Sequence, residues 1–199
     1  MESKPVKPFV LAAGIFALVA IVAWTQSHQL GALIGGVLAL WTASFGAGRA
    51  NRWLGILVAG SSSLLVSLYL GVQHKGIAGK SICSVNQTFD CDKVNSSVYA
   101  ELFDVPIAFL GSSFYAGVIV LAILCLRSPG AYKSAASIVA AGAGVSVLYS
   151  VFLAYASYGL GAWCLFCITL YGLNLITLWL SYSLAKESGE GVLKGAFSA

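Results

Sequence analysis

Four of the five cysteines in the chain fall into two pairs that could carry out thiol–disulfide chemistry. Cys164 and Cys167 form a Cys-x-x-Cys pair at the start of a strongly apolar run, and seven residues separate Cys83 from Cys91. Thiols on the first turn of a helix face unpaired N–H groups and the positive end of the helix dipole, which favour a thiolate. If that helix spans a membrane, the pair at its start could pass electrons between a water-borne partner and a lipid-soluble carrier.

The composition is that of a membrane protein. Of the 199 residues, 59% are hydrophobic and only 9% are charged, whereas a soluble globular domain carries about 25% charged residues. The net charge of +4 comes from residues at the ends of apolar runs and forms no basic patch interleaved with aromatic residues, so no nucleic-acid partner is expected. The sequence therefore predicts an all-α integral membrane protein.

Six apolar runs are long enough to cross a bilayer, which takes about 17–25 helical residues. They cover residues 8–25, 30–48, 53–73, 106–126, 134–158 and 163–183. A short basic head precedes the first run, as in a signal peptide, but no convincing small-residue cleavage site follows it, so we expect this run to be retained as a span. An even number of spans places both termini on the same side of the membrane.

The positions of the Lys and Arg residues give this bundle an orientation. With the N-terminus in the cytoplasm, the external side receives only three of the eleven basic residues, namely Lys75, Lys80 and Lys93. The cytoplasmic side receives the other eight, which are Lys4, Lys7, Arg49, Arg52, Arg127, Lys133, Lys186 and Lys194. This asymmetry follows the positive-inside rule. We therefore expect a multi-pass protein of the inner (cell) membrane with both termini in the cytoplasm.

One long polar segment, residues 74–105, then lies outside, on the periplasmic side. It contains Cys83 and Cys91, and its tail at 95–103 is typical of a short capped amphipathic helix that could cover the mouth of the bundle. The short connection 159–162 brings Cys164 to the same face, so the two pairs should meet there. Cys125, near the cytoplasmic end of the fourth span, is expected to be a small buried apolar residue.

Three chemistries suit two cysteine pairs on an external face. Structural disulfides would explain Cys83 with Cys91 but explain Cys164 with Cys167 poorly, because so short a ring removes little chain entropy. A four-thiolate zinc site is disfavoured by the long Cys83-x7-Cys91 spacing and by an external location, so no metal is expected. A redox relay through both pairs is the favoured interpretation.

The arrangement of these residues resembles the vitamin K epoxide reductase family, in the form of a prokaryotic homologue. The resemblance covers about residues 53–183 and rests on Cys83-x7-Cys91, the following Asp92-Lys93-Val94-Asn95-Ser96-Ser97, Val105-Pro106-Ile107-Ala108, Gly111, Tyr115, Cys164-x-x-Cys167 and Tyr171. It implies a four-helix bundle around a quinone of the ubiquinone or menaquinone type, here in residues 53–185. Residues 1–52 would form two spans outside this core, and residues 186–199 a cytoplasmic tail.

The resemblance also implies roles for single residues. A separate periplasmic thioredoxin-fold protein would exchange with Cys83, and Cys91 would pass electrons to Cys164 through a transient disulfide. Cys167 would face the quinone, so the chain would be a quinone-dependent thiol–disulfide oxidoreductase that supports disulfide formation.

Three hydroxyl side chains are candidates for contact with the quinone. Tyr171, one helical turn after Cys167, would hydrogen-bond a quinone carbonyl, although tyrosines also occur at membrane interfaces for packing alone. Ser96 and Ser97 could lie near the quinone or could simply cap a helix. His28 and His74 are expected to be interface residues with no carboxylate neighbour.

Three other functions stay open at this stage. Reduction of vitamin K epoxide uses the same thiol relay, so the sequence separates it poorly from disulfide formation. An unrelated bacterial quinone-linked oxidase also uses two cysteine pairs, but with the Cys-x-x-Cys pair first. A non-enzymatic membrane subunit would use the disulfides only to staple its outer face.

Overall fold

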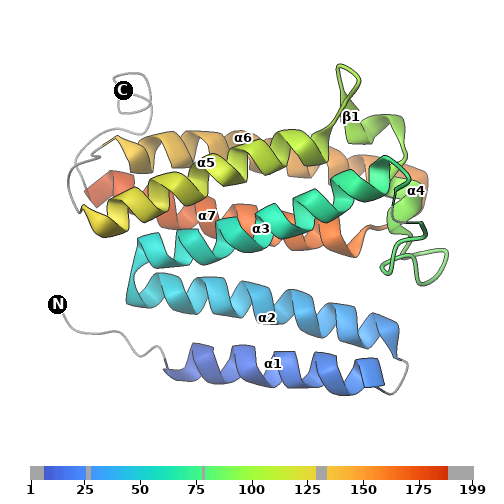
Figure 1. Ribbon diagram of the computed structural model, residues 1–199, viewed down its shortest axis with the longest axis horizontal. Helices are drawn as coiled ribbons and strands as arrows, with labels where there is room; N and C mark the ends of the chain where they lie inside the picture. Colours follow the sequence, from blue (N-terminus) through green and yellow to red (C-terminus); the bar gives the residue numbers. More distant parts are fainter. Residues whose placement is uncertain (1–6, 26–27, 78, 129–133, 188–199) are drawn as a thin grey trace.

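The computed structural model describes residues 7–25, 28–77, 79–128 and 134–187, and these residues form an all-α membrane protein (Figure 1). Six helices in this part of the chain are long and apolar enough to cross a bilayer, which confirms the six predicted spans. They are α1 (Lys7–Thr25), α2 (Gln29–Ala50), α3 (Arg52–His74), α5 (Ile107–Arg127), α6 (Ala135–Leu160) and α7 (Leu165–Glu187). The tail beyond residue 187 and the predicted cytoplasmic residues Lys4, Lys133 and Lys194 lie outside the described residues.

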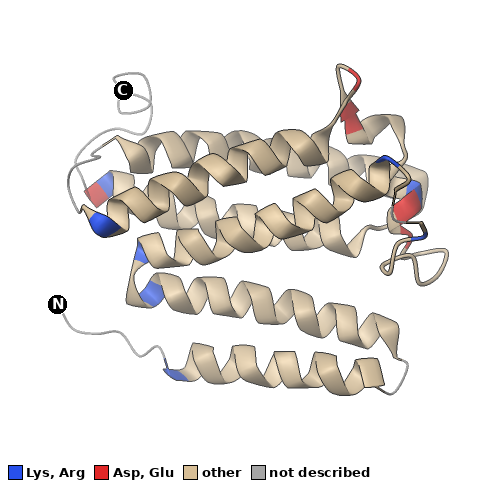
Figure 2. Cartoon of the chain, viewed as in Figure 1, with Lys and Arg blue, Asp and Glu red and all other residues tan. Residues whose placement is uncertain are grey.

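The charged side chains of the described residues gather at the two ends of the bundle. Figure 2 shows uncharged ribbon along the middle of every long helix, with blue and red segments only at the ends. Arg52 pairs with Glu187 at one end, and the loop with Cys83 and Cys91 forms the other. This distribution is what a bilayer demands, since a charge in the hydrocarbon core is costly.

The helices form layers, as Figure 1 shows. α3 packs against α5 and α7, and α7 packs against α6, whereas α5 and α6 touch each other only sparsely. α2 lies against α3 and α7, and α1 is the outermost helix, packed chiefly on α2 with no buried residue of its own. The bundle of α3, α5, α6 and α7 is therefore the core, with α2 and α1 added on one side.

Local signals in the sequence mark the start of α3 and the end of α6. Asn51 separates α2 from α3 with an extended backbone, and its side chain accepts the N–H groups of Trp53 (2.9 Å) and Leu54 (3.3 Å) as an N-cap. Gly161 ends α6 in the left-handed conformation (φ +63°), which glycine adopts without a steric penalty. That turn brings the chain directly into Cys164.

The loop between α3 and α5 has a different structure from the one predicted. A short helix is present, but it is α4 (Cys91–Asn95), and the helix predicted at 95–103 is wrong. After α4 the chain forms a 3₁₀ turn, η1 (Val98–Ala100), and an antiparallel hairpin of β1 (Glu101–Leu102) and β2 (Val105–Pro106). We call α4, η1 and the hairpin together, residues 91–106, the cap.

The cause of this difference lies in which residue caps the helix. Asp90 is the N-cap, and its carboxylate accepts the N–H of Lys93 at 3.1 Å. Ser96 is already the C-cap, and Ser97 has an extended backbone. Phe103 and Asp104 then adopt positive φ angles of 53° and 62°, which close the hairpin. Because Asp90 starts the helix, Asn95 and Ser96 form its C-terminal end. They therefore do not start the helix that was predicted over residues 95–103.

Candidate functional site

Cys83 and Cys91 form a disulfide in the loop between α3 and α5, with their Cα atoms 5.6 Å apart. Both side chains are fully shielded, with exposed fractions of 0% and 1%. They belong to a buried cluster around Leu70 and Val94, which lie at the end of α3 and on α4. A partner protein cannot reach this disulfide without a movement of the surrounding loop.

Cys164 brings a free thiol to this disulfide. It lies directly before α7, and its sulfur and those of Cys83 and Cys91 are all within 4.8 Å of one another. The N–H of Cys167 donates a hydrogen bond to the Cys164 sulfur at 3.2 Å, so this cysteine is placed like a helix N-cap. Such a donor can stabilise negative charge on the sulfur while it takes part in an exchange.

Two main-chain hydrogen bonds hold the disulfide loop against Cys164. The N–H of Trp163 donates to the carbonyl of Thr88 at 2.7 Å, and the N–H of Asp90 donates to the carbonyl of Trp163 at 3.1 Å. Together they form a small parallel bridge between Phe89 and Trp163. Phe89 lies two residues before Cys91 and Trp163 directly before Cys164, so the bridge brings these two cysteines close together.

Cys167, the fourth cysteine, opens onto a cavity of about 260 Å³ within the core bundle. Side chains from α3, α5, α6 and α7 line it, and the cap forms one wall through Val94, Asn95, Ala100 and Leu102. Most of the lining is apolar. Two of the helices that line the cavity, α5 and α6, pack only sparsely against each other. The cavity therefore lies where the helices of the bundle are packed least tightly.

Tyr171 and Asn174 follow Cys167 along the same cavity wall. The Tyr171 hydroxyl is buried, and no described residue gives it a hydrogen bond of good geometry; the Ser157 side chain is its polar neighbour. Asn174, by contrast, accepts a hydrogen bond from the Tyr115 hydroxyl (3.0 Å) and donates one to Ser150 (3.2 Å). The cavity therefore offers the Tyr171 hydroxyl near Cys167 and, one helical turn further along α7, the hydrogen-bonded side chain of Asn174.

The two serines proposed as cofactor contacts do not line this cavity. Ser96 is exposed at the end of α4, and the Ser97 hydroxyl donates to the carbonyl of Val94 at 2.7 Å. Their neighbour Asn95 lines the cavity instead, and its side chain donates to the carbonyl of Leu70 at 2.8 Å. A role for Ser96 or Ser97 stays a prediction, without a contact in this structure that supports it.

His74 has a place in the site that the sequence analysis missed. Its Nδ1 lies 2.6 Å from the carbonyl oxygen of Asn95, and its Nε2 lies 2.8 Å from the carboxylate of Glu101. The expectation that His74 has no carboxylate neighbour is therefore wrong. The partners are 21 and 27 residues away, so no local pattern could have indicated them. His28 makes no capping hydrogen bond through its side chain.

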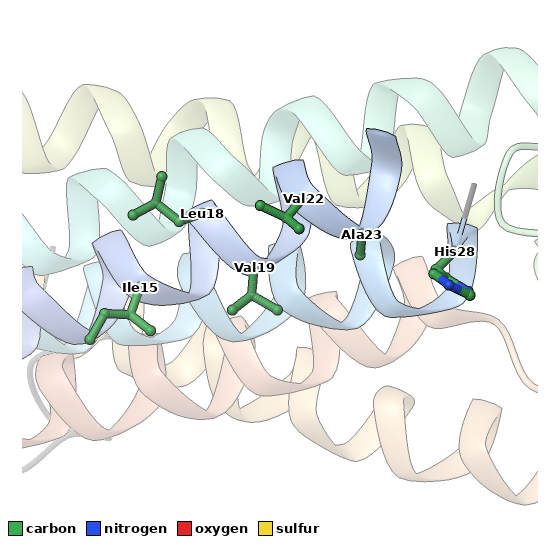
Figure 3. Close-up of a pocket in the computed structure, with 6 residues that line it drawn as sticks. All are labelled: Ile15, Leu18, Val19, Val22, Ala23 and His28. Atoms are coloured by element: carbon green, nitrogen blue, oxygen red, sulfur yellow. The ribbon is translucent and has the colours of Figure 1, made fainter. Parts of the chain in front are cut away.

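Cys125 and a second hollow lie apart from this chemistry. Cys125 is buried near the other end of α5, as expected for a packing residue. The hollow, shown in Figure 3, measures about 360 Å³ and is lined by His28 and five aliphatic residues of α1. Its walls carry no group that could react with a thiol, and it lies on the outermost helix, so we assign it no role in the relay.

Comparison with known proteins agrees with this geometry. No curated protein matches the chain. The model of the vitamin K epoxide reductase family matches residues 53–182, which extend from the start of α3 into α7 and include the four clustered cysteines and the cavity. Since this match covers more than half of the chain, the protein belongs to the vitamin K epoxide reductase family and is a membrane oxidoreductase.

Proposed function

We propose that this protein is a thiol–disulfide oxidoreductase that takes electrons from a thioredoxin-fold partner and passes them to a quinone. The observation that carries the proposal is the position of Cys164. Its free thiol lies within 4.8 Å of the sulfurs of the Cys83–Cys91 disulfide, while Cys167, three residues on, opens onto the cavity. The four cysteines thus form a continuous path from the loop to the cavity.

The relay proceeds by thiolate attack on disulfides, in which each bond formed replaces a bond broken. A partner dithiol reduces Cys83–Cys91 to two thiols and leaves as a disulfide. The Cys91 thiolate then attacks Cys164 of a Cys164–Cys167 disulfide and releases the Cys167 thiolate. Attack of Cys83 on Cys91 restores the loop disulfide and frees Cys164. The state described here, with the loop disulfide closed and both inner thiols free, is the one reached after this transfer.

The cavity fits a quinone head group on several grounds. Ligand pockets commonly measure about 300–1,000 Å³ and are mostly apolar with a few polar groups; this cavity has the same kind of lining and, at about 260 Å³, lies just below that range. The Tyr171 hydroxyl, which has no hydrogen bond of good geometry among the described residues, could donate one to a carbonyl oxygen. The sparse contact between α5 and α6 suits a ligand with a lipid-soluble tail. A quinone supplies an acceptor for two electrons and two protons. Cys164 and Cys167 release that number of each when they close their disulfide.

The orientation that suits this function places the cysteine end outside the cytoplasm, in the inner (cell) membrane. Thioredoxin-fold partners that make disulfides work in an oxidising compartment, where disulfides persist. The described basic residues at the opposite end of the bundle, Lys7, Arg49, Arg52, Arg127 and Lys186, support a cytoplasmic position for that end.

A reconstituted assay tests the relay. Purified protein in detergent receives a reduced thioredoxin-fold donor and a soluble quinone, and the rate of quinone reduction is measured. We expect Ala substitutions at Cys83, Cys91, Cys164 and Cys167 each to lower this rate at least about 10²-fold, because each breaks one exchange step. The matched control is Cys125→Ala, which removes a buried cysteine outside the cluster and should keep the rate.

A second electron donor distinguishes the role of the Cys83–Cys91 pair from that of the Cys164–Cys167 pair. Dithiothreitol is small enough to reduce Cys164–Cys167 directly, so it should restore activity to Cys83→Ala and Cys91→Ala but not to Cys164→Ala or Cys167→Ala. If activity survives without Cys164 or Cys167, the relay is wrong and the Cys83–Cys91 disulfide is structural.

A further inference from the structure

A network of hydrogen bonds joins the two segments that carry Cys83 and Cys91, in addition to the disulfide between them. The Asp92 carboxylate accepts the N–H of Ser81 with both oxygens, at 3.1 and 3.2 Å. The Ser84 hydroxyl donates to Asp90 at 3.0 Å and accepts the N–H of Asp92 at 3.0 Å. The residues on either side of Cys91 are thus bonded to residues on either side of Cys83.

Further contacts anchor the Cys83 side of this network. The N–H of Cys83 donates to the Ser81 hydroxyl at 3.3 Å, and the N–H of Ile82 donates to the Tyr69 hydroxyl of α3 at 3.3 Å. Ser81 itself is buried. Asp90 and Asp92 have no ion-pair partner among the described residues, so their charges are balanced chiefly by these N–H and O–H donors.

None of these hydrogen bonds requires the sulfur–sulfur bond. They keep the two segments at the observed Cα separation of 5.6 Å, which lies within the narrow range that a disulfide needs. When a donor opens the disulfide, a loop without such bonds could spread apart and gain conformational entropy. A loop that keeps these hydrogen bonds holds the Cys83 and Cys91 thiols close enough to form the disulfide again.

We propose that Ser84, Asp90 and Asp92 are positioning residues that keep Cys83 beside Cys91 in the dithiol state and so favour re-formation of their disulfide. This inference rests on the proposed relay and gives a reason why electrons pass from the loop pair to Cys164 and Cys167. Because coupling between two sets of interactions is reciprocal, hydrogen bonds that the disulfide strengthens must in turn favour the disulfide. A pair that re-closes readily is a strong reductant, so it passes its two electrons on to Cys164 and Cys167.

The thiol–disulfide equilibrium of the loop pair tests this inference directly. The full-length protein in detergent is equilibrated with glutathione buffers, in which two glutathione thiols supply two electrons and two protons and leave as glutathione disulfide. Free thiols are then alkylated, and mass spectrometry measures the oxidised fraction of each cysteine pair. One variant is Ser84→Ala, which removes hydrogen bonds without changing the charge. The other is Asp92→Ala, which removes hydrogen bonds and a negative charge together.

We expect Ser84→Ala and Asp92→Ala to lower the equilibrium constant for the Cys83–Cys91 disulfide about tenfold, which is about 30 mV for a two-electron couple. Asp104→Asn is the matched control, since it removes an exposed acidic charge from the same loop at a residue without a described hydrogen bond through its side chain. In this control, the equilibrium constant for the Cys83–Cys91 disulfide should stay within about twofold of the wild-type value. The constant for the Cys164–Cys167 disulfide should stay within the same limit in every variant.

Two results would overturn the inference. The first is a wild-type equilibrium in both Ser84→Ala and Asp92→Ala. The second is an equal change in the equilibrium constant of the Cys164–Cys167 pair, which would indicate general loosening of the structure, or an equal change for Cys83–Cys91 in Asp104→Asn, which would indicate an effect of charge alone. If Asp92→Ala does not fold, Ser84→Ala decides the matter. The measurement needs neither quinone nor partner protein, so failure of the relay assay and failure of this inference are separate outcomes.

Discussion

The Tyr171 hydroxyl is buried in the lining of the cavity without a hydrogen bond of good geometry from any described residue. A buried polar group left unsatisfied costs roughly 1–3 kcal/mol of stability. Phenylalanine would fill the same space without that cost. The hydroxyl therefore contributes little to the stability of the fold, and a contact with a bound ligand is the simplest use for it.

Tyr171→Phe should separate activity from stability. We expect kcat/KM for quinone reduction to fall on the order of 10²-fold, as when a single hydrogen-bond donor to a developing negative charge is removed. The melting temperature should stay the same or rise, because an unsatisfied buried hydroxyl is lost. The control is Tyr155→Phe, which removes a hydroxyl from an exposed position on α6. A fall in melting temperature with unchanged kcat/KM would show that the hydroxyl is structural.

Among the elements, the cap is bonded to the last turn of α3 through the His74 side chain. His74 bonds the carbonyl of Asn95 at the end of α4 and the carboxylate of Glu101 in β1, and both ring nitrogens are used. The His74 side chain is only 10% exposed, whereas its partner Glu101 is 41% exposed, so solvent weakens the bond to Glu101 more than the bond to the Asn95 carbonyl. Since the cap forms one wall of the cavity, His74 clamps that wall in place.

His74→Ala should therefore loosen the cap while leaving the residues of α7 in position. We expect the KM for quinone to rise about tenfold, which corresponds to a loss of ~1.4 kcal/mol of binding free energy, with a much smaller change in kcat. Limited proteolysis should cut the cap faster in this variant. His28→Ala is the control, because His28 makes no capping hydrogen bond through its side chain. An unchanged KM together with unchanged proteolysis would mean that other contacts hold the cap.

The elements also show what the sequence could and could not predict. Hydropathy identified all six long helices, because the length of an apolar run is a local property that the bilayer makes decisive. The family resemblance likewise identified the four cysteines that cluster, although their roles stay predictions. The order and spacing of those cysteines carry enough information for a family to be identified from motifs alone.

The cap was predicted less well because non-local contacts shape it. Asp90, rather than a residue near Ser96, caps its helix, and the hairpin after η1 depends on positive φ angles at Phe103 and Asp104. The bond between His74 and Glu101 joins residues 27 positions apart. Patterns of a few residues indicate the type of an element, but they do not indicate which of several polar side chains will meet across a folded loop.

The whole molecule extends beyond the part that matches the family. α2 is closely fitted to the core: the Trp41 side chain donates to the carbonyl of Thr169 at 3.0 Å, and it lies so near Gly172 that no β-carbon would fit there. α7 therefore carries the cavity residues on one face and is supported by α2 on another. α1 has no such contact with the core, which is consistent with a helix that faces lipid on most sides.

The orientation of the whole molecule decides whether the proposed relay could meet the proposed partner outside the cytoplasm. Five described basic residues lie at the end of the bundle opposite the cysteines, and three, Lys75, Lys80 and Lys93, lie in the loop at the cysteine end. The positive-inside rule counts basic residues and gives little weight to acids. The acids at the cysteine end therefore do not weaken the expectation that this end lies outside the cytoplasm.

Labelling of single cysteines tests this orientation. In a variant with all five native cysteines replaced by Ala, Gln87→Cys places a thiol in the exposed loop, and Ser128→Cys places a matched exposed thiol just after α5. We expect a membrane-impermeant maleimide to label the Gln87→Cys protein in cells with an intact inner membrane. It should label the Ser128→Cys protein only after permeabilisation, because the bilayer separates the reagent from that end. The reverse pattern would place the cysteine pairs in the cytoplasm, where thiols are kept reduced, and a role in disulfide formation would then be untenable.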